Sequence, residues 1–264
     1  MLPGPFHPNR YRDTWIYRLW RRLRHLDRHK TKLKEASFYH DLIRKQGCGL
    51  VFDVGANKGA KAAIFAEVAK RVVCVEPSPT SARILKKRFP NSKVISVVAA
   101  GVGAEVGSLA FHMFGESDCY NTFSTKWVDS LGAEDVETGR PAKEILNVIE
   151  VPVTTLDDLI VRFGTPCYIK IDVEGFEVEV IKGLSQAVNL ISFECNLPEF
   201  EIEALECLER IDEIQSCAQF NYCTTEPPTG FASNRWLNYS EMAQVIMDRS
   251  HPFIEIYSRR APDR

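Results

Sequence analysis

The chain has 264 residues, 45% of them hydrophobic and 26% charged, with a formal net charge of −2. This composition excludes a collagen-like or intrinsically disordered chain and suits one large α/β domain with additions. No stretch approaches the roughly 18 apolar residues of a membrane-spanning helix, and the N-terminus lacks the apolar segment of a secretory signal. The eight cysteines form no Cys-x-x-Cys motif, so we expect reduced thiols and a cytoplasmic protein.

The charge is unevenly distributed along the chain. Residues 1–35 contain ten Lys and Arg against three Asp and Glu, a charge of +7, and the remainder carries 23 against 32, a charge of −9. Trp15, Leu19 and Leu23 recur at helical spacing among arginines, which predicts a basic amphipathic helix. We expect an N-terminal helical extension over residues 1–40 and a main domain over 41–264.

Two roles fit this basic helix. Its apolar stripe can pack on the main domain, or the helix can bind an anionic membrane or another acidic partner. The second role would place the protein peripherally at a membrane. Nucleic acid is not the expected partner, because no RNA-binding signature accompanies the charge.

From residue 50 onward, strand patterns alternate with helical ones. Strands are expected at 50–54, 71–76, 93–100, 108–114, 149–155, 167–172, 189–195 and 253–259. Helices are expected at 59–70, 79–89, 156–163, 176–184, 199–213 and 239–249. This alternation predicts an α/β fold whose parallel sheet has helices on both faces. Residues 115–147 show little periodicity and are expected to form a long substrate loop.

Acidic residues recur where the predicted strands end. Asp53, Glu76, Asp172 and Glu194 all lie at such ends, and Ala100 ends the third strand. Parallel sheets bind ligands at the carboxyl ends of their strands, where the strand order reverses. We therefore expect these positions to surround one ligand site.

The first turn, in "VFDVGANKGA", separates the possible ligands. Its spacing is Gly55-x-x-x-Gly59 with Asp53 just before it, whereas a dinucleotide turn uses Gly-x-Gly-x-x-Gly beside a pyrophosphate. An acid there would repel a pyrophosphate but can accept the amine of S-adenosylmethionine, while the N-terminus of the following helix faces the carboxylate. Glu76, after the second strand, can accept hydrogen bonds from both ribose hydroxyls.

The stretches "FDVGANKG", "CVEPSP" and "TTLDDLI…YIKIDVEGFEVEVIKGL" resemble the FkbM family of S-adenosylmethionine-dependent methyltransferases over roughly residues 48–200. The resemblance implies the Rossmann-like class I fold, a seven-stranded, mostly parallel sheet with one antiparallel strand that 253–259 would supply. It also implies methyl transfer, mostly to oxygen, on a sugar, glycolipid or polyketide-type natural product. The expected S-adenosylmethionine contacts are Asp53, Gly55, Ala56, Asn57, Gly59, Glu76, Pro77 and Ala100.

The expected catalytic residues are Asp172, Glu174 and Lys170. An alcohol becomes a good nucleophile only when a base takes its proton, and Asp172 or Glu174 is placed to do so. Lys170 interrupts an apolar strand two residues before Asp172 and is expected to pair with an acid or to orient the base. Asp172, Glu174 and Glu194 are also weak candidates for a divalent metal, although no metal is predicted.

Other functions remain open at this point. The acceptor atom could be nitrogen, because the residues indicate the donor far better than the acceptor. An NAD-linked oxidoreductase is disfavoured by Asp53 and by the missing glycine motif. A non-catalytic protein that binds S-adenosylmethionine, recruited by the basic helix, is the remaining alternative.

Overall fold

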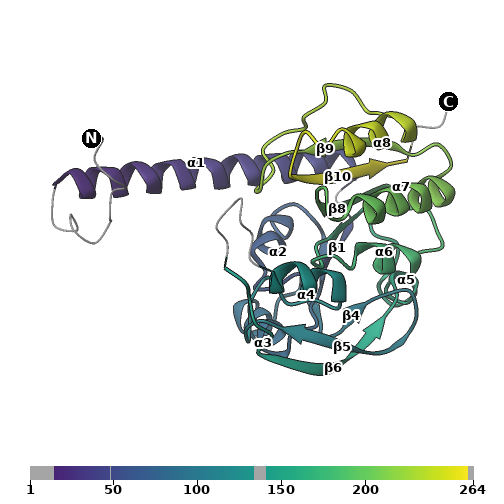
Figure 1. Ribbon diagram of the computed structural model, residues 1–264, viewed down its shortest axis with the longest axis horizontal. Helices are drawn as coiled ribbons and strands as arrows, with labels where there is room; N and C mark the ends of the chain where they lie inside the picture. Colours follow the sequence, from purple (N-terminus) through teal and green to yellow (C-terminus); the bar gives the residue numbers. More distant parts are fainter. Residues whose placement is uncertain (1–14, 48, 134–140, 261–264) are drawn as a thin grey trace.

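The computed structural model describes residues 15–47, 49–133 and 141–260, with side chains described from residue 30 onward. A seven-stranded sheet lies at its centre, in the order β3-β2-β1-β7-β8-β10-β9 (Figure 1). The strands are β1 (Leu50–Val54), β2 (Arg71–Val75), β3 (Ile95–Val98), β7 (Tyr168–Ile171), β8 (Leu190–Asn196), β9 (Gln219–Cys223) and β10 (Phe253–Arg259). β10 runs antiparallel to both β8 and β9, and the other ladders are parallel. The predicted class I sheet, including its antiparallel strand, is confirmed.

Helices cover both faces of this sheet, as predicted. Side chains alternate along β1: Leu50, Phe52 and Val54 enter one apolar core, and Val51 enters the other. The first core packs against α5 (Leu156–Phe163), α6 (Glu177–Lys182), α7 (Glu201–Gln215) and α8 (Tyr239–Met247). The second packs against α1 (Trp15–Lys45), α2 (Ala60–Phe65) and α3 (Pro79–Arg88).

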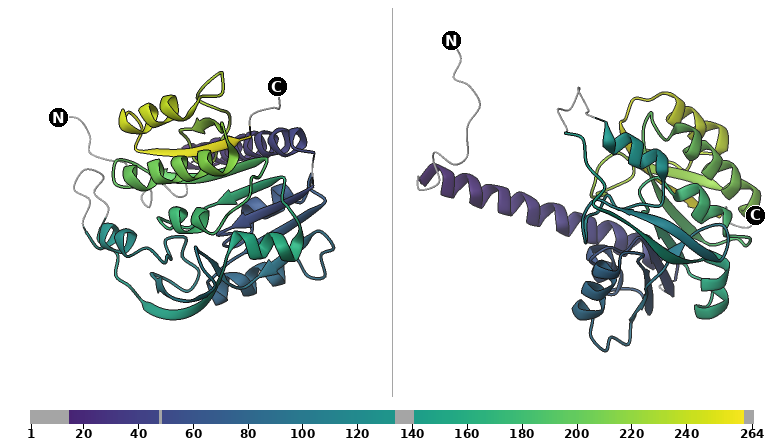
Figure 2. Two further views of the ribbon diagram at one scale, coloured as in Figure 1. Left: turned by 90° about the vertical axis from the view of Figure 1, so that its right-hand side faces the viewer. Right: turned by 60° about the horizontal axis from the view of Figure 1, so that its bottom comes forward.

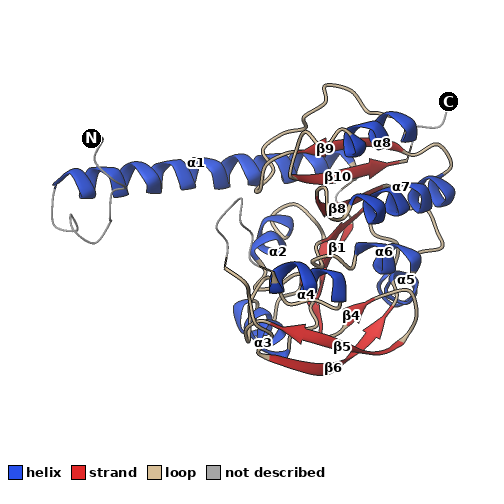
Figure 3. Cartoon of the chain, in the orientation of Figure 1, coloured by secondary structure: helices blue, strands red, loops and turns tan. Residues whose placement is uncertain are grey.

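A second, three-stranded sheet lies beside the first (Figure 3), in the order β4-β6-β5. Its strands are β4 (Gly101–Val102), β5 (Gly107–Met113) and β6 (Asn147–Thr154). The strand expected at 93–100 is shorter than predicted, because β3 ends at Val98 and the chain then enters the second sheet as β4.

The expected loop over 115–147 contains a helix, α4 (Thr125–Gly132). The side-chain oxygen of Ser124 accepts a hydrogen bond from the Trp127 amide and caps this helix. Trp127 and Leu131, four residues apart, are both buried, so the helix forms because its apolar side packs into the core. The expected loop is therefore interrupted by a helix, and its role at the substrate stays a prediction. Residues 134–140 lie outside the described part of the chain.

The N-terminal helix is a single element that runs past residue 40. Tyr39, Leu42 and Ile43 are buried in the second core, where α1 packs on α2. The other half of α1 extends away from the rest of the molecule (Figure 2). Side chains of the expected apolar stripe, Trp15 to Leu26, lie outside the described set. Among the described helices, none combines the length and apolar character needed to cross a membrane.

The helix after the first turn is shorter than expected. The sequence predicts residues 59–70, whereas α2 ends at Phe65. Beyond it the amides of Glu67 and Val68 bond three residues back, to Ile64 and Phe65, which tightens the chain into turns. α2 is thus less than two turns long.

Candidate functional site

A cavity of about 530 Å³ opens at the carboxyl ends of β1, β2, β7 and β8. This edge includes the boundary between β1 and β7, where the order of the sheet reverses. The predicted site residues that line the cavity are Asp53, Gly55, Ala56, Asn57, Glu76, Pro77, Ala100, Asp172, Glu174 and Glu194. The structure therefore brings together nearly all residues that the sequence placed at strand ends.

Two predicted residues do not line the cavity. Gly59 adopts a φ of +76°, and a Cβ there would lie 2.6 Å from Cδ2 of Leu85 on α3. The missing side chain lets the turn pack against α3, and the predicted contact of Gly59 with the cofactor stays a prediction. Lys170 is fully buried under the cavity floor, so it acts only through the residues that it touches.

The first turn is held by backbone hydrogen bonds to β2. The amides of Gly55 and Ala56 both donate to the Val75 carbonyl, at 2.9 and 3.1 Å. Asn57 follows with a φ of +46°, and its amide donates to Glu76 Oε2 at 2.8 Å. This turn aligns the ends of β1 and β2 beneath the cavity.

Asp53 and Glu76 are the two buried acids at the carboxyl ends of β1 and β2. Glu76 Oε1 accepts from the Ser78 amide at 2.8 Å, so each carboxylate oxygen holds one backbone donor and keeps a free lone pair. Asp53 is 1% exposed, and its Oδ2 atom has no hydrogen-bond partner among the described residues. Burial raises the pKa of Asp53 to about 6 and that of Glu76 to about 7.

Lys170 is fully buried and lies at the centre of a polar ladder across the sheet. Its Nζ atom contacts Asp172 Oδ2 at 2.7 Å and Glu194 Oε1 at 3.3 Å. Burial opposes its charge, but Asp172, Glu194 and Glu255 together outweigh burial and raise the pKa of Lys170. Lys170 thereby holds two cavity-lining carboxylates in place.

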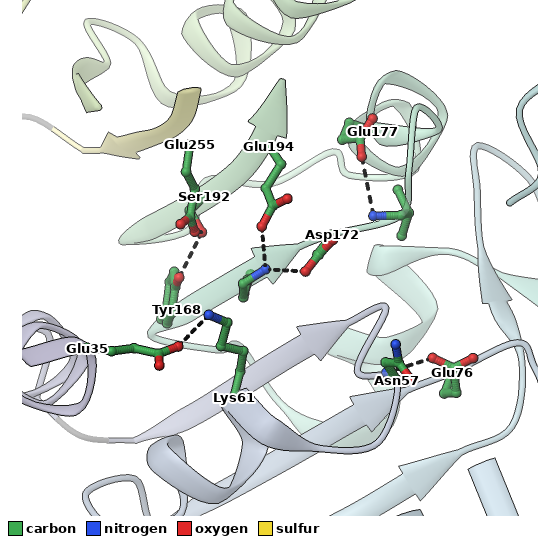
Figure 4. Close-up of polar contacts among 12 residues, drawn as sticks. Glu35, Asn57, Lys61, Glu76, Tyr168, Asp172, Glu177, Ser192, Glu194 and Glu255 are labelled. Atoms are coloured by element: carbon green, nitrogen blue, oxygen red, sulfur yellow. Dashed lines mark hydrogen bonds and ion pairs between the residues drawn. The ribbon is translucent and has the colours of Figure 1, made fainter. Parts of the chain in front are cut away.

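The register of the strands explains this ladder. Lys170 pairs across the sheet with Asp53 on β1 and Ser192 on β8, and Glu194 pairs with Glu255 on β10. Ser192 Oγ donates to Glu255 Oε1 at 3.1 Å and lies 2.7 Å from the Tyr168 hydroxyl (Figure 4). All these side chains point to the face that α1 and α2 cover.

Glu174 lies in the turn between β7 and α6. Its φ is +54°, and its carbonyl accepts from the Thr122 hydroxyl at 2.7 Å. Glu177 supports the turn from the other side, because its Oε1 atom accepts from the amides of Val173 and Gly175. The pKa of Glu174 is raised by burial first, and then by the negative charges of Asp172 and Glu194.

Aromatic side chains line the cavity together with the acids. Tyr120 and Phe123 line the cavity from the segment that leads into α4, and Trp127 lines it from the first turn of α4 itself. Lys143 fixes this segment from outside, 3.2 Å from Asp118 Oδ2 and over the Tyr120 ring. The sequence led us to expect that residues 115–147 face the ligand site. The positions of these aromatic side chains favour that expectation, which stays a prediction.

The weak metal candidates are not arranged as ligands. Within the described residues, no group of three His, Cys, Asp or Glu is placed to hold a metal ion. Asp172 and Glu194 both point to the Lys170 ammonium (Figure 4). The cation between these two carboxylates is therefore a side chain of the protein itself.

Sequence reasoning missed Lys61, Asn196, Glu226 and Phe253, which also line the cavity, and it missed Glu255. Glu255 carried a usable signal, because it is an acid inside the apolar strand "FIEIYS" just as Lys170 is a base inside "CYIKI". Opposite charges inside two apolar strands indicate that they lie in one buried polar network, and here β8 lies between the two strands. Lys61, only two residues after Gly59, had no such local signal.

Comparison with known proteins now adds to this geometry. The model of the family described as "Methyltransferase FkbM domain" matches residues 53–221. None of the curated proteins is similar enough in sequence to match the chain.

Two solved structures illustrate the structural similarity. A TehB-like SAM-dependent methyltransferase from Corynebacterium glutamicum has a TM-score of 0.42 and 11% identity, covering 86% of this chain and 88% of that one. An O-methyltransferase from Bacillus cereus, in complex with SAH, has a TM-score of 0.41 and 13% identity, covering 85% and 80%. Because these identities and TM-scores are low, the assignment of the fold rests on the strand order of the chain itself.

Proposed function

The chain belongs to the FkbM family of S-adenosylmethionine-dependent methyltransferases, and from this premise we propose that it methylates a hydroxyl oxygen. The proposed acceptor is a sugar, a glycolipid or a polyketide-type natural product. The observation that carries the proposal is the presence of Asp172 and Glu174 in the same cavity as Asp53 and Glu76. One half of the cavity then serves the donor, and the other serves an acceptor whose proton must be removed.

The residues of the first half fit the donor. Asp53 offers a buried carboxylate oxygen without a partner, which suits an amine. Glu76 is oriented by two amides and keeps lone pairs for a ribose diol. Gly55 leaves no room for a Cβ, which would collide with the Asp172 carbonyl, so the turn lies directly against the end of β7.

The two catalytic carboxylates have different surroundings, which suggests different roles. When bound, S-adenosylmethionine supplies an activated methyl group, so the protein must mainly position the acceptor and take its proton. Asp172 is paired with Lys170, whereas no cation lies within ion-pair distance of Glu174 among the described residues. The raised pKa of Glu174 makes it a stronger base than an ordinary glutamate.

In this proposal Glu174 accepts the hydroxyl proton, and Asp172 accepts a hydrogen bond that orients the acceptor. Lys170 is a positioning residue, because it reaches only the carboxylates of Asp172 and Glu194. The aromatic side chains Tyr120 and Trp127 offer flat apolar surfaces against which a sugar ring or polyketide can pack.

The test uses S-adenosylmethionine with a labelled methyl group and pairs of acceptors that differ in one hydroxyl or amine. We expect label on oxygen, and a loss of roughly 10²–10⁴-fold in turnover for Glu174→Gln with S-adenosylhomocysteine affinity retained. Glu209→Gln, on the exposed side of α7, is the matched control and should turn over normally. Label recovered on nitrogen alone would contradict the proposal.

A further inference from the structure

Lys61 is a cation in the cavity wall that the proposed function does not yet use. It is the second residue of α2, its side chain is 18% exposed, and it lines the cavity with Asp53. Burial is the main influence on the pKa of Asp53, and the positive charge of Lys61 opposes the resulting rise. An acid and a base therefore line the same cavity beside the first turn.

The shortness of α2 explains why a cation is needed at this position. The sequence suggested that the N-terminus of a helix over residues 59–70 would face the donor carboxylate. The observed helix has only six residues, and Gly59 at its start provides no side-chain cap. A helix this short has a weak dipole, because the dipole sums over aligned peptide groups. The positive charge of Lys61 beside the turn can supply the attraction for the donor carboxylate that the short helix lacks.

We infer that Lys61 binds the carboxylate of the donor's amino-acid end, that Asp53 takes its amine, and that Glu35 of α1 positions Lys61. This inference rests on the proposed function, because it assumes that the amino-acid end lies at the first turn. Asp53 and Lys61 then provide one negative and one positive charge for the zwitterionic amino-acid end of the donor.

Glu35 reaches Lys61 from a different part of the chain (Figure 4). It lies on α1, is 8% exposed, and its Oε1 atom forms an ion pair with Lys61 Nζ. The ammonium also lies 5.6 Å from the centre of the Tyr39 ring, a second contact from α1. An ammonium has three donors, so binding Glu35 leaves donors for a ligand carboxylate. The packed half of α1 is thus part of the donor site.

Calorimetry with three ligands tests this assignment. S-adenosylhomocysteine carries the whole amino-acid end, its decarboxylated analogue lacks only the carboxylate, and 5′-methylthioadenosine lacks both charged groups. We expect Lys61→Met to weaken S-adenosylhomocysteine about tenfold or more, and to leave the affinities of the other two ligands unchanged. Glu35→Gln should give a smaller loss with the same pattern.

The double variant Glu35→Gln/Lys61→Met guards against misfolding, because it removes both charges of the buried pair. It should bind 5′-methylthioadenosine as the wild type does and still lose affinity for S-adenosylhomocysteine. Lys58 is exposed, three residues away, and also lines the cavity, so Lys58→Met tests the competing cation and on this inference leaves S-adenosylhomocysteine affinity unchanged.

Three outcomes would overturn the inference. Equal losses for S-adenosylhomocysteine and its decarboxylated analogue would give Lys61 a purely structural role. A selective loss in Lys58→Met that Lys61→Met does not show would assign the carboxylate to Lys58. If the wild type binds none of the three ligands, the proposed function itself fails, and this result is distinct from the other two.

Discussion

Gly55 lies directly against the backbone of Asp172, so that a Cβ built at Gly55 would be 1.7 Å from the Asp172 carbonyl oxygen. The Asp172 amide in turn donates to the Val54 carbonyl at 3.0 Å. The turn after β1 and the end of β7 are therefore in contact through their backbones. This contact joins the half of the cavity that we propose for the donor to the half that we propose for the acceptor.

Replacement of Gly55 by alanine should damage both halves together. The φ of +81° is unfavourable for alanine, and its methyl group would displace the Asp172 backbone. We expect Gly55→Ala to lower the free energy of unfolding by about 2 kcal/mol or more and to weaken S-adenosylhomocysteine binding. Thermal unfolding and calorimetry measure the two effects. Gly107→Ala, where a Cβ meets nothing within 4 Å, is the control, and equal effects in both variants would contradict the argument.

Glu76 should make the ligand-free protein less stable as the pH rises. Its pKa of about 7 in the folded state lies above the ordinary value of 4.5, so between these values the folded state binds more protons than the unfolded state. Stability from this group is therefore lost between pH 4.5 and 7. Relative to Glu76→Gln, which does not titrate, the wild type should lose roughly 2–3 kcal/mol from pH 5 to 8. Urea unfolding across this range is the measurement. If the difference in unfolding free energy between the wild type and Glu76→Gln does not change with pH, a raised pKa of Glu76 is excluded.

Lys170 should be far more important for stability than an exposed lysine in an ion pair. Lys170→Met leaves the carboxylates of Asp172 and Glu194 without their buried cation, which is expected to cost about 3–5 kcal/mol of folding free energy. The comparison is Lys182→Met, whose ion pair with Glu179 is exposed and worth less than about 1 kcal/mol. Chemical denaturation compares the variants, and similar losses would show that the network is not held by Lys170.

We propose that the projecting half of α1 binds anionic membranes. Residues 1–28 carry seven Arg against two Asp, and the N-terminal half of α1 extends away from the body (Figure 1). Removal of residues 1–28 spares Glu35 and the packed half, so it should abolish sedimentation with phosphatidylserine vesicles and leave S-adenosylhomocysteine affinity intact. A variant with Arg21, Arg22 and Arg24 changed to Gln tests charge without shortening the helix. If sedimentation is unchanged in both variants, the helix does not bind anionic membranes, and its partner is a different molecule.

Short-range patterns were enough to predict the sheet and half of the site. Alternating strand and helix signals, with an acid after a strand, predicted the positions of Asp53, Glu76 and Asp172 at one edge. These predictions worked because the side-chain period of a strand and the geometry of a glycine turn depend on neighbouring residues only. The parallel connection of strands then brings their carboxyl ends together.

Other features depend on contacts between residues far apart in the chain. The partners of Lys170 follow from the register of three strands, and the pairing of Glu35 with Lys61 follows from how α1 packs on α2. The helix in the expected loop forms because Trp127 and Leu131 find a core to enter. Burial and long-range pairing set these interactions, and no local pattern of residues encodes which distant surface a side chain will meet.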